Sequence, residues 1–147
     1  MTADVDSLVA FLRQQLDKDE QVAREAADND SGRWFVGDKW NVYRAEDCTP
    51  HEDHETNELV VYGNIEVQSA HIARWDPSRV LAEVAAKREI LRRFESAAEW
   101  ADTCRAEGRP EAEAHARHAG SLLEVIGILA QPYAGRPGWR DEWAVVG

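Results

Sequence analysis

The pair Asp76-Pro77 constrains this chain more than any other feature, because it marks the start of the longest periodic segment. An aspartate can accept hydrogen bonds from the free N–H groups of a first helical turn, and proline is favoured at the first helical position. Beyond the pair, seven side chains recur every three or four residues, which places them on one face of a helix. We therefore predict a helix over residues 77 to about 106. The residues on its face are Val80, Val84, Lys87, Leu91, Phe94, Ala98 and Ala101.

Two further long helices are predicted by the same periodicity. Residues 4–28 form an amphipathic segment that ends at turn-forming residues, and residues 110–129 form another that ends before Pro132. Gly108-Arg109-Pro110 separates the last two long helices, and so short a connection predicts an antiparallel hairpin. Residues 69–75 are expected to form a short helix that leads into the Asp76 start.

Short segments rich in aromatic and β-branched residues predict strands between the first two long helices. Residues 34–36 and 40–43 flank a turn, and residues 58–62 and 65–67 flank Gly63-Asn64, so two hairpins are expected. The predicted fold is α+β: an N-terminal helix, a small antiparallel sheet of three to four strands and a C-terminal helical hairpin. A length of 147 residues favours a single domain over residues 1–147.

The charge distribution excludes several classes of partner. The net charge is −11, and residues 1–30 and 46–58 carry an excess of acids that equals it, so generic nucleic-acid binding is not expected. No apolar run reaches the roughly 18 residues of a membrane span, and the N-terminus shows no secretory signal. Cys48 and Cys104 match no zinc spacing, and two reduced thiols are typical of a cytoplasmic protein.

Three blocks of sequence resemble a family of small proteins of actinobacteria and their phages, which is classed as a domain of unknown function. The blocks are residues 8–12, residues 70–81, and residues 129–134 together with 136–143. They lie near the start, middle and end of the chain. The resemblance implies an actinobacterial or phage origin and a cytosolic setting, and it implies no activity or catalytic residue.

A metal site is one interpretation of the last long helix. Glu111, His115 and His118 share a face, which the hairpin would turn toward the small residues near Cys104. Imidazole and thiolate are good zinc ligands, so this interpretation makes the protein a small metal-dependent hydrolase. The alternative is a polar helix start near solvent. The run His51-Glu52-Asp53-His54-Glu55 also offers metal-ligand side chains, but such loops are more often solvated linkers.

An anion site is a second interpretation, where the short helix meets the long one. His71, Arg74 and Arg79 lie beside the positive start of the long helix, with His71 able to act as an acid or base. In the structural alternative, Asp76 is the helix cap, one arginine pairs with a nearby carboxylate, and His71 makes local hydrogen bonds.

The six tryptophans indicate a binding surface. Trp100 is rotated by about 200° from Val80, away from the apolar face, and Trp139 and Trp143 lie in a tail rich in proline and glycine. Exposed aromatic residues are typical anchors of protein interfaces. Alternatively, the tail folds back and the tryptophans close the chain's own core.

These observations favour a non-enzymatic protein-interaction module that acts through an aromatic and acidic surface, with self-association into a homodimer as one form. Lys87 in the apolar face would set the register of two helices or extend to solvent at its edge. The alternatives are the metal-dependent hydrolase that uses His115 and His118, and an acidic phage-type decoy or inhibitor of a host protein. A decoy needs the carboxylates of residues 1–30 and 46–58 on one surface.

Overall fold

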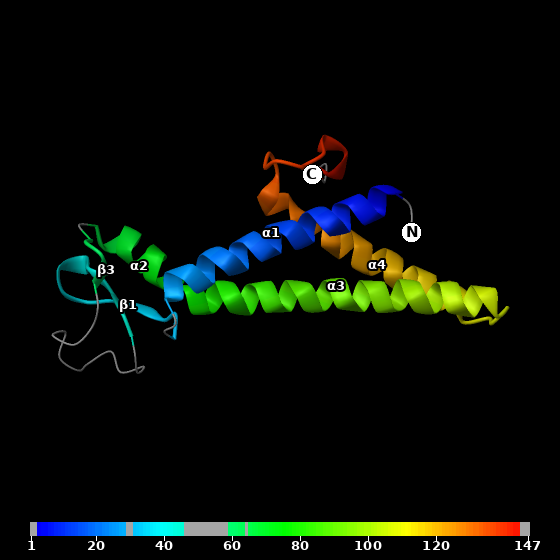
Figure 1. The fold of residues 1–147 in the computed structure, drawn as a ribbon, viewed down its shortest axis with the longest axis horizontal. Helices are drawn as coiled ribbons and strands as arrows, with labels where there is room; N and C mark the ends of the chain where they lie inside the picture. The colour runs from blue at the N-terminus through cyan, green and yellow to red at the C-terminus, as the bar shows by residue number, and fades with distance from the viewer. Residues whose placement is uncertain (1–2, 29–30, 46–58, 64, 145–147) are drawn as a thin grey trace. The chain divides into compact units, whose positions relative to one another are not determined.

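The computed structural model describes residues 3–28, 31–45, 59–63 and 65–144 (Figure 1). It confirms the α+β class, with long helices at both ends of the chain and a small antiparallel sheet between them. The elements, in chain order, are α1 (Ala3–Ala27), β1 (Trp34–Val36), a 3₁₀ turn (Asp38–Trp40), β2 (Val42–Arg44), β3 (Leu59–Val61), α2 (Glu66–Arg74), α3 (Pro77–Ala106), α4 (Ala112–Ala130) and two 3₁₀ turns (Gln131–Tyr133 and Asp141–Trp143).

The chain divides into two compact units. Unit 1 comprises residues 1–17 and 85–147, and unit 2 comprises residues 18–84. Unit 2 is one continuous stretch of sequence, whereas unit 1 combines two stretches from the two ends of the chain. The expectation of a single domain over residues 1–147 stays a prediction.

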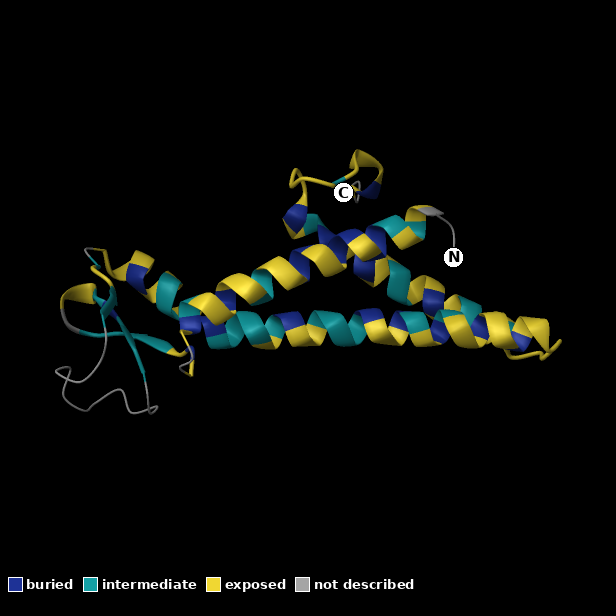
Figure 2. Cartoon of the chain, in the orientation of Figure 1, coloured by how far each residue is buried: buried dark blue, intermediate teal, exposed yellow. Residues whose placement is uncertain are grey.

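Unit 1 is built from the first half of α1, most of α3, and α4. After the break at residues 107–111, α4 turns back along α3, as the predicted hairpin requires (Figure 1). Each helix contributes a stripe of buried side chains, which shows as dark blue in Figure 2. The largest buried members are Leu8, Phe11, Leu12, Leu16, Leu91, Phe94, Ile126, Tyr133 and Trp143. Those that lie in α1, α3 and α4 are the positions that the 3.6-residue period places on one face of a helix, whereas Tyr133 and Trp143 come from the tail.

The start of α3 satisfies the free N–H groups of its first turn, and it confirms Asp76 as the cap. Oδ1 of Asp76 accepts a hydrogen bond from the backbone N–H of Arg79 at 2.9 Å. The N–H of Ser78 donates to the carbonyl of Gly32 at 3.0 Å, and the N–H of Val80 donates to the carbonyl of Asp76. Pro77 has no N–H to satisfy, so the first turn is complete.

Unit 2 contains the sheet, with its strands in the order β1-β2-β3 and both pairs antiparallel. Phe35 lies opposite Tyr43 in the register, and their rings stack at 5.7 Å. Helix α2 packs against β1 and β2, and Val42 of β2 is fully buried. Oδ2 of Asp76 also accepts the backbone N–H of Trp34 at 3.3 Å, which joins the first strand to the start of α3.

The expectation of a fourth strand over residues 65–67 is wrong, because these residues open α2. The N–H of Ser69 donates to the carbonyl of Ile65 at 3.1 Å, which is a helical i to i+4 bond. Just before the helix, Gly63 leaves no room for a side chain, because a Cβ there would lie 1.6 Å from the carbonyl oxygen of Trp40. The alternation Ile65-Glu66-Val67 fits a half-buried strand. Val67 is nevertheless 77% exposed, so burial of its side chain does not stabilise a strand here.

Candidate protein-interaction surface

The three residues of the predicted metal site do not converge. His115 is half-buried and its ring stacks with that of Trp100 at 6.2 Å, whereas His118 and Glu111 are exposed. Within the described residues, no group of three or more His, Cys, Asp or Glu side chains is placed to hold a metal ion. Cys104 is buried, and the run 51–55 lies outside the described residues.

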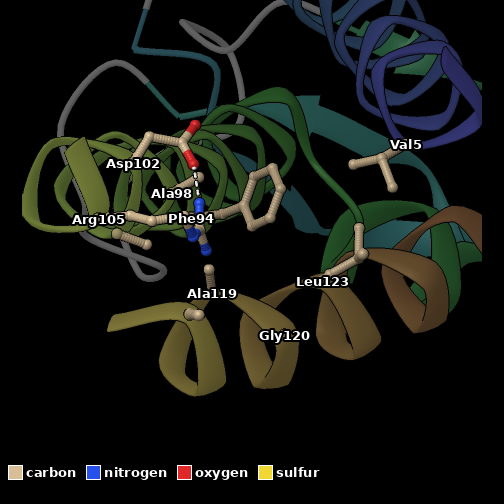
Figure 3. Close-up of a pocket in the computed structure, with 10 residues that line it drawn as sticks. Val5, Phe94, Ala98, Asp102, Arg105, Ala119, Gly120 and Leu123 are labelled. Carbon is tan, nitrogen blue, oxygen red and sulfur yellow. Dashed lines mark hydrogen bonds and ion pairs between the residues drawn. The ribbon is translucent and has the colours of Figure 1, made fainter. Parts of the chain in front are cut away.

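A shallow groove of about 210 Å³ occupies the place in unit 1 where the sequence suggested imidazoles beside small residues (Figure 3). Its lining combines small side chains of α3 and α4 with a few larger apolar ones, and an ion pair between Arg105 and Asp102 at 2.6 Å lies on its α3 side. The lining residues are Val5, Phe94, Ala98, Ala101, Asp102, Arg105, Ala116, Ala119, Gly120 and Leu123. No imidazole is among them.

The tail tryptophans, Trp139 and Trp143, pack against Phe11 within unit 1. Trp143 is 7% exposed, its ring lies 5.4 Å from that of Phe11, and its Nε1–H donates to Asp4 at 3.1 Å. Trp139 packs edge-on against Phe11 at 5.8 Å. The tail therefore folds back, which is the second interpretation of the sequence, and it does not present Trp143 as an interface anchor.

Trp100 and Lys87 occupy different environments. Trp100 is 49% exposed and faces away from the buried stripe of α3, as its angular position predicted. Lys87 is half-buried, and its Nζ lies 5.8 Å from the centre of the Tyr133 ring. A cation over an aromatic face is stabilised by the ring quadrupole, so Lys87 is accommodated within the chain's own packing.

The residues of the predicted anion site lie together in unit 2, but some of them already interact with other side chains. The guanidinium of Arg79 lies 4.1 Å from the Trp75 ring centre, and its Nε donates to Glu83 at 3.0 Å. His71 is exposed and its ring lies 6.2 Å from that of Trp75. Asp76 caps the start of α3. Arg74 is exposed and makes no hydrogen bond or ion pair in the part of the chain that the structure describes.

His71 and Arg74 form part of a larger surface that we call the α2 face. It consists of the outward side chains of the helix and of the residue that follows it: Glu66, Val67, Ala70, His71, Arg74 and Trp75, all of them exposed. Beside them, Val67, Gln68, His71 and Ile72 line a hollow of about 450 Å³. Tyr62 and Ile65, which precede the helix, are also exposed.

The apolar part of this surface is not among the predictions made from the sequence. Ile65 and Val67 are predicted to lie in a strand, where alternate side chains would be buried. In the helix that forms instead, Val67, His71 and Trp75 stand one turn apart on the exposed side. An i, i+4, i+8 test on residues 67–75 would have found the row.

The chain matches the model of the Family of unknown function (DUF6221) over residues 5–145. It belongs to this family. The match covers nearly the whole chain and both units. No curated protein and no solved structure matches it.

Membership of DUF6221 confirms the predicted resemblance to a domain of unknown function. The actinobacterial or phage origin stays a prediction. The family description names no activity. In the described residues, no helix is both long and apolar enough to cross a bilayer.

Proposed function

We propose that this DUF6221 protein is a non-enzymatic protein-interaction module, and that the α2 face is the surface through which it binds a protein partner. The observation that carries the proposal is the exposure of large apolar side chains around α2. Tyr62, Ile65 and Val67 are 80%, 50% and 77% exposed, and Trp75 is 43% exposed. Exposed large apolar side chains gathered on one element are typical of interaction sites.

The composition of the surface supports the same proposal. Trp75 supplies a large aromatic anchor, and Arg79 stacks against its ring, which limits the motion of both side chains before a partner arrives. Tryptophan and arginine are the residue types most enriched at binding hot spots. The hollow beside Val67 can receive an apolar side chain of a partner.

The proposal is tested by site-specific photocrosslinking in cells that make this protein naturally. Val67 is replaced by p-benzoylphenylalanine, and the matched control carries the same replacement at Ile128 in α4. Ile128 is also apolar and is 58% exposed, but it belongs to unit 1. We expect a discrete protein adduct from position 67 and at least about tenfold less from position 128, because hot-spot contacts are localised. Equal adduct yields at the two positions, or none from position 67, would contradict the proposal.

A further inference from the structure

We infer that the α2 face binds the α2 face of a second copy of this chain, with the two helices antiparallel about a two-fold axis. The inference rests on the proposed function and names its partner. It follows from the order of charged, small and apolar side chains along α2, which is complementary to its own reverse.

The first row of the α2 face carries the charges. Glu66, Ala70 and Arg74 stand at i, i+4 and i+8, so the carboxylate and the guanidinium are separated by about 12 Å along the helix. Neither Glu66 nor Arg74 has a hydrogen bond or ion pair with any described residue. Both charged groups are thus available to a partner.

A two-fold axis that passes near Ala70 would place Glu66 of each copy beside Arg74 of the other. The same contact then forms twice, as every contact of a two-fold interface must. The methyl side chain of Ala70 at the middle of the row lets the two helices approach closely. A parallel arrangement would instead put Glu66 beside Glu66 and Arg74 beside Arg74, so charge selects the antiparallel one.

The second row carries the apolar contacts. Val67, His71 and Trp75 stand one turn apart, and the antiparallel arrangement places Val67 of one copy against Trp75 of the other. The two His71 rings meet near the axis. Arg79 and Glu83, the charged residues next to this row, are paired with each other at 3.0 Å and add no unpaired charge.

The α2 face is small. A nine-residue helix covers less than the roughly 800 Å² per partner of a standard interface, as weak and transient associations do, so we expect a dissociation constant in the micromolar range. Such a dimer forms at high protein concentration and dissociates on dilution.

The experiment is sedimentation equilibrium of the purified full chain from about 5 to 500 µM, a range that brackets the expected dissociation constant. Glu66→Arg and Arg74→Glu are each expected to weaken dimerisation at least about tenfold, since each variant creates two like-charge contacts. An equimolar mixture of the two variants restores two opposite-charge contacts, so a heterodimer close to wild-type affinity is expected. Glu113→Arg, an exposed charge reversal in α4, is the control and leaves the affinity unchanged.

Three outcomes overturn this inference. They are a wild-type chain that is monomeric at 500 µM, a dimer that is insensitive to both charge reversals, and single variants that fail to recombine. Circular dichroism of each variant shows whether it is folded. If the photocrosslink at position 67 captures a different protein while the chain stays monomeric, the proposed function stands and only the identity of the partner is wrong.

Discussion

The two units of this chain differ in how many of their large apolar side chains are buried. Unit 1 buries leucines, phenylalanines, an isoleucine, a tyrosine and a tryptophan from three helices and the tail. In unit 2, Val42 and Val84 are the largest aliphatic side chains among the described buried residues. Seven of the ten described large apolar side chains that are exposed belong to unit 2, among them Tyr62 and Val67.

This difference indicates where each unit obtains its stability. Burial of apolar area is the main favourable term in folding, so unit 1 has the larger hydrophobic contribution. Unit 2 depends more on specific hydrogen bonds, above all those of Asp76, which link the start of β1 to the start of α3. Apolar side chains that are not used in folding remain available for binding, and this is the physical basis of the function that we propose.

The largest expected effect is that of truncating the core of unit 1. Leu12 is 0% exposed, and Leu12→Ala is expected to lower the free energy of unfolding by about 2–5 kcal/mol. Val42→Ala, at a position of unit 2 that is also 0% exposed, removes fewer atoms and is expected to cost about 2 kcal/mol. Urea denaturation measures both. A larger cost at Val42 than at Leu12 would invert the comparison of the two units.

Asp76 tests whether hydrogen bonds hold unit 2. Asp76→Ala removes the acceptors of the Arg79 and Trp34 N–H groups, and we expect a loss of about 1–2 kcal/mol. Asp76→Asn keeps one oxygen for the cap and should be much milder. Hydrogen exchange at the Trp34 amide should accelerate in the alanine variant. Equal urea midpoints for Asp76→Ala and wild type would show that this cap contributes nothing.

Gln15 is an exception to the apolar core of unit 1. It is 1% exposed, and neither its amide nitrogen nor its amide oxygen has a partner among the described residues. An unsatisfied buried amide is destabilising, so Gln15→Met is expected to raise the free energy of unfolding by about 1 kcal/mol. Gln14→Met changes an exposed neighbour and is the control. A destabilised Gln15→Met variant would show that Gln15 has a bound partner, such as an internal water molecule.

The smallest expected effect belongs to the exposed charges of unit 1. Hydrogen bonds from Arg92 and Arg93 lower the pKa of Glu89 to about 2 from 4.5. The folded state therefore keeps this carboxylate ionised at a pH where the unfolded chain has bound a proton. Its contribution is complete above pH 4.5 and is lost as the pH falls to about 2. The difference in stability between wild type and Glu89→Gln should shrink over that interval, and a constant difference would contradict the shift.

Local sequence signals predicted most of the helical fold. Asp76-Pro77 identified the first residue of α3, and Gly108-Arg109-Pro110 identified the break before α4, because capping and chain reversal depend on a few adjacent residues. The hairpin of β1 and β2 was predicted for the same reason. The fourth strand predicted over residues 65–67 does not form: these residues fit a strand pattern, but helix α2 begins at Glu66.

The candidate surface was predicted only in part. His71, Arg74 and Arg79 follow from their sequence proximity to a helix start, but Ile65 and Val67 beside them are predicted as part of a strand. Trp139 and Trp143 show the same limit. Their contacts with Phe11 join residues more than 120 positions apart, and no local pattern encodes such a pairing.

The sequence by itself determined where the long helices begin and end and which of their faces are apolar. Those properties follow from capping and from the 3.6-residue period, which act within a few residues. Only the tertiary structure decided which aromatic residues close the core of unit 1 and which apolar side chains of α2 stay exposed. Burial depends on what packs against a side chain, and for Trp143 and Phe11 that partner comes from the opposite end of the chain.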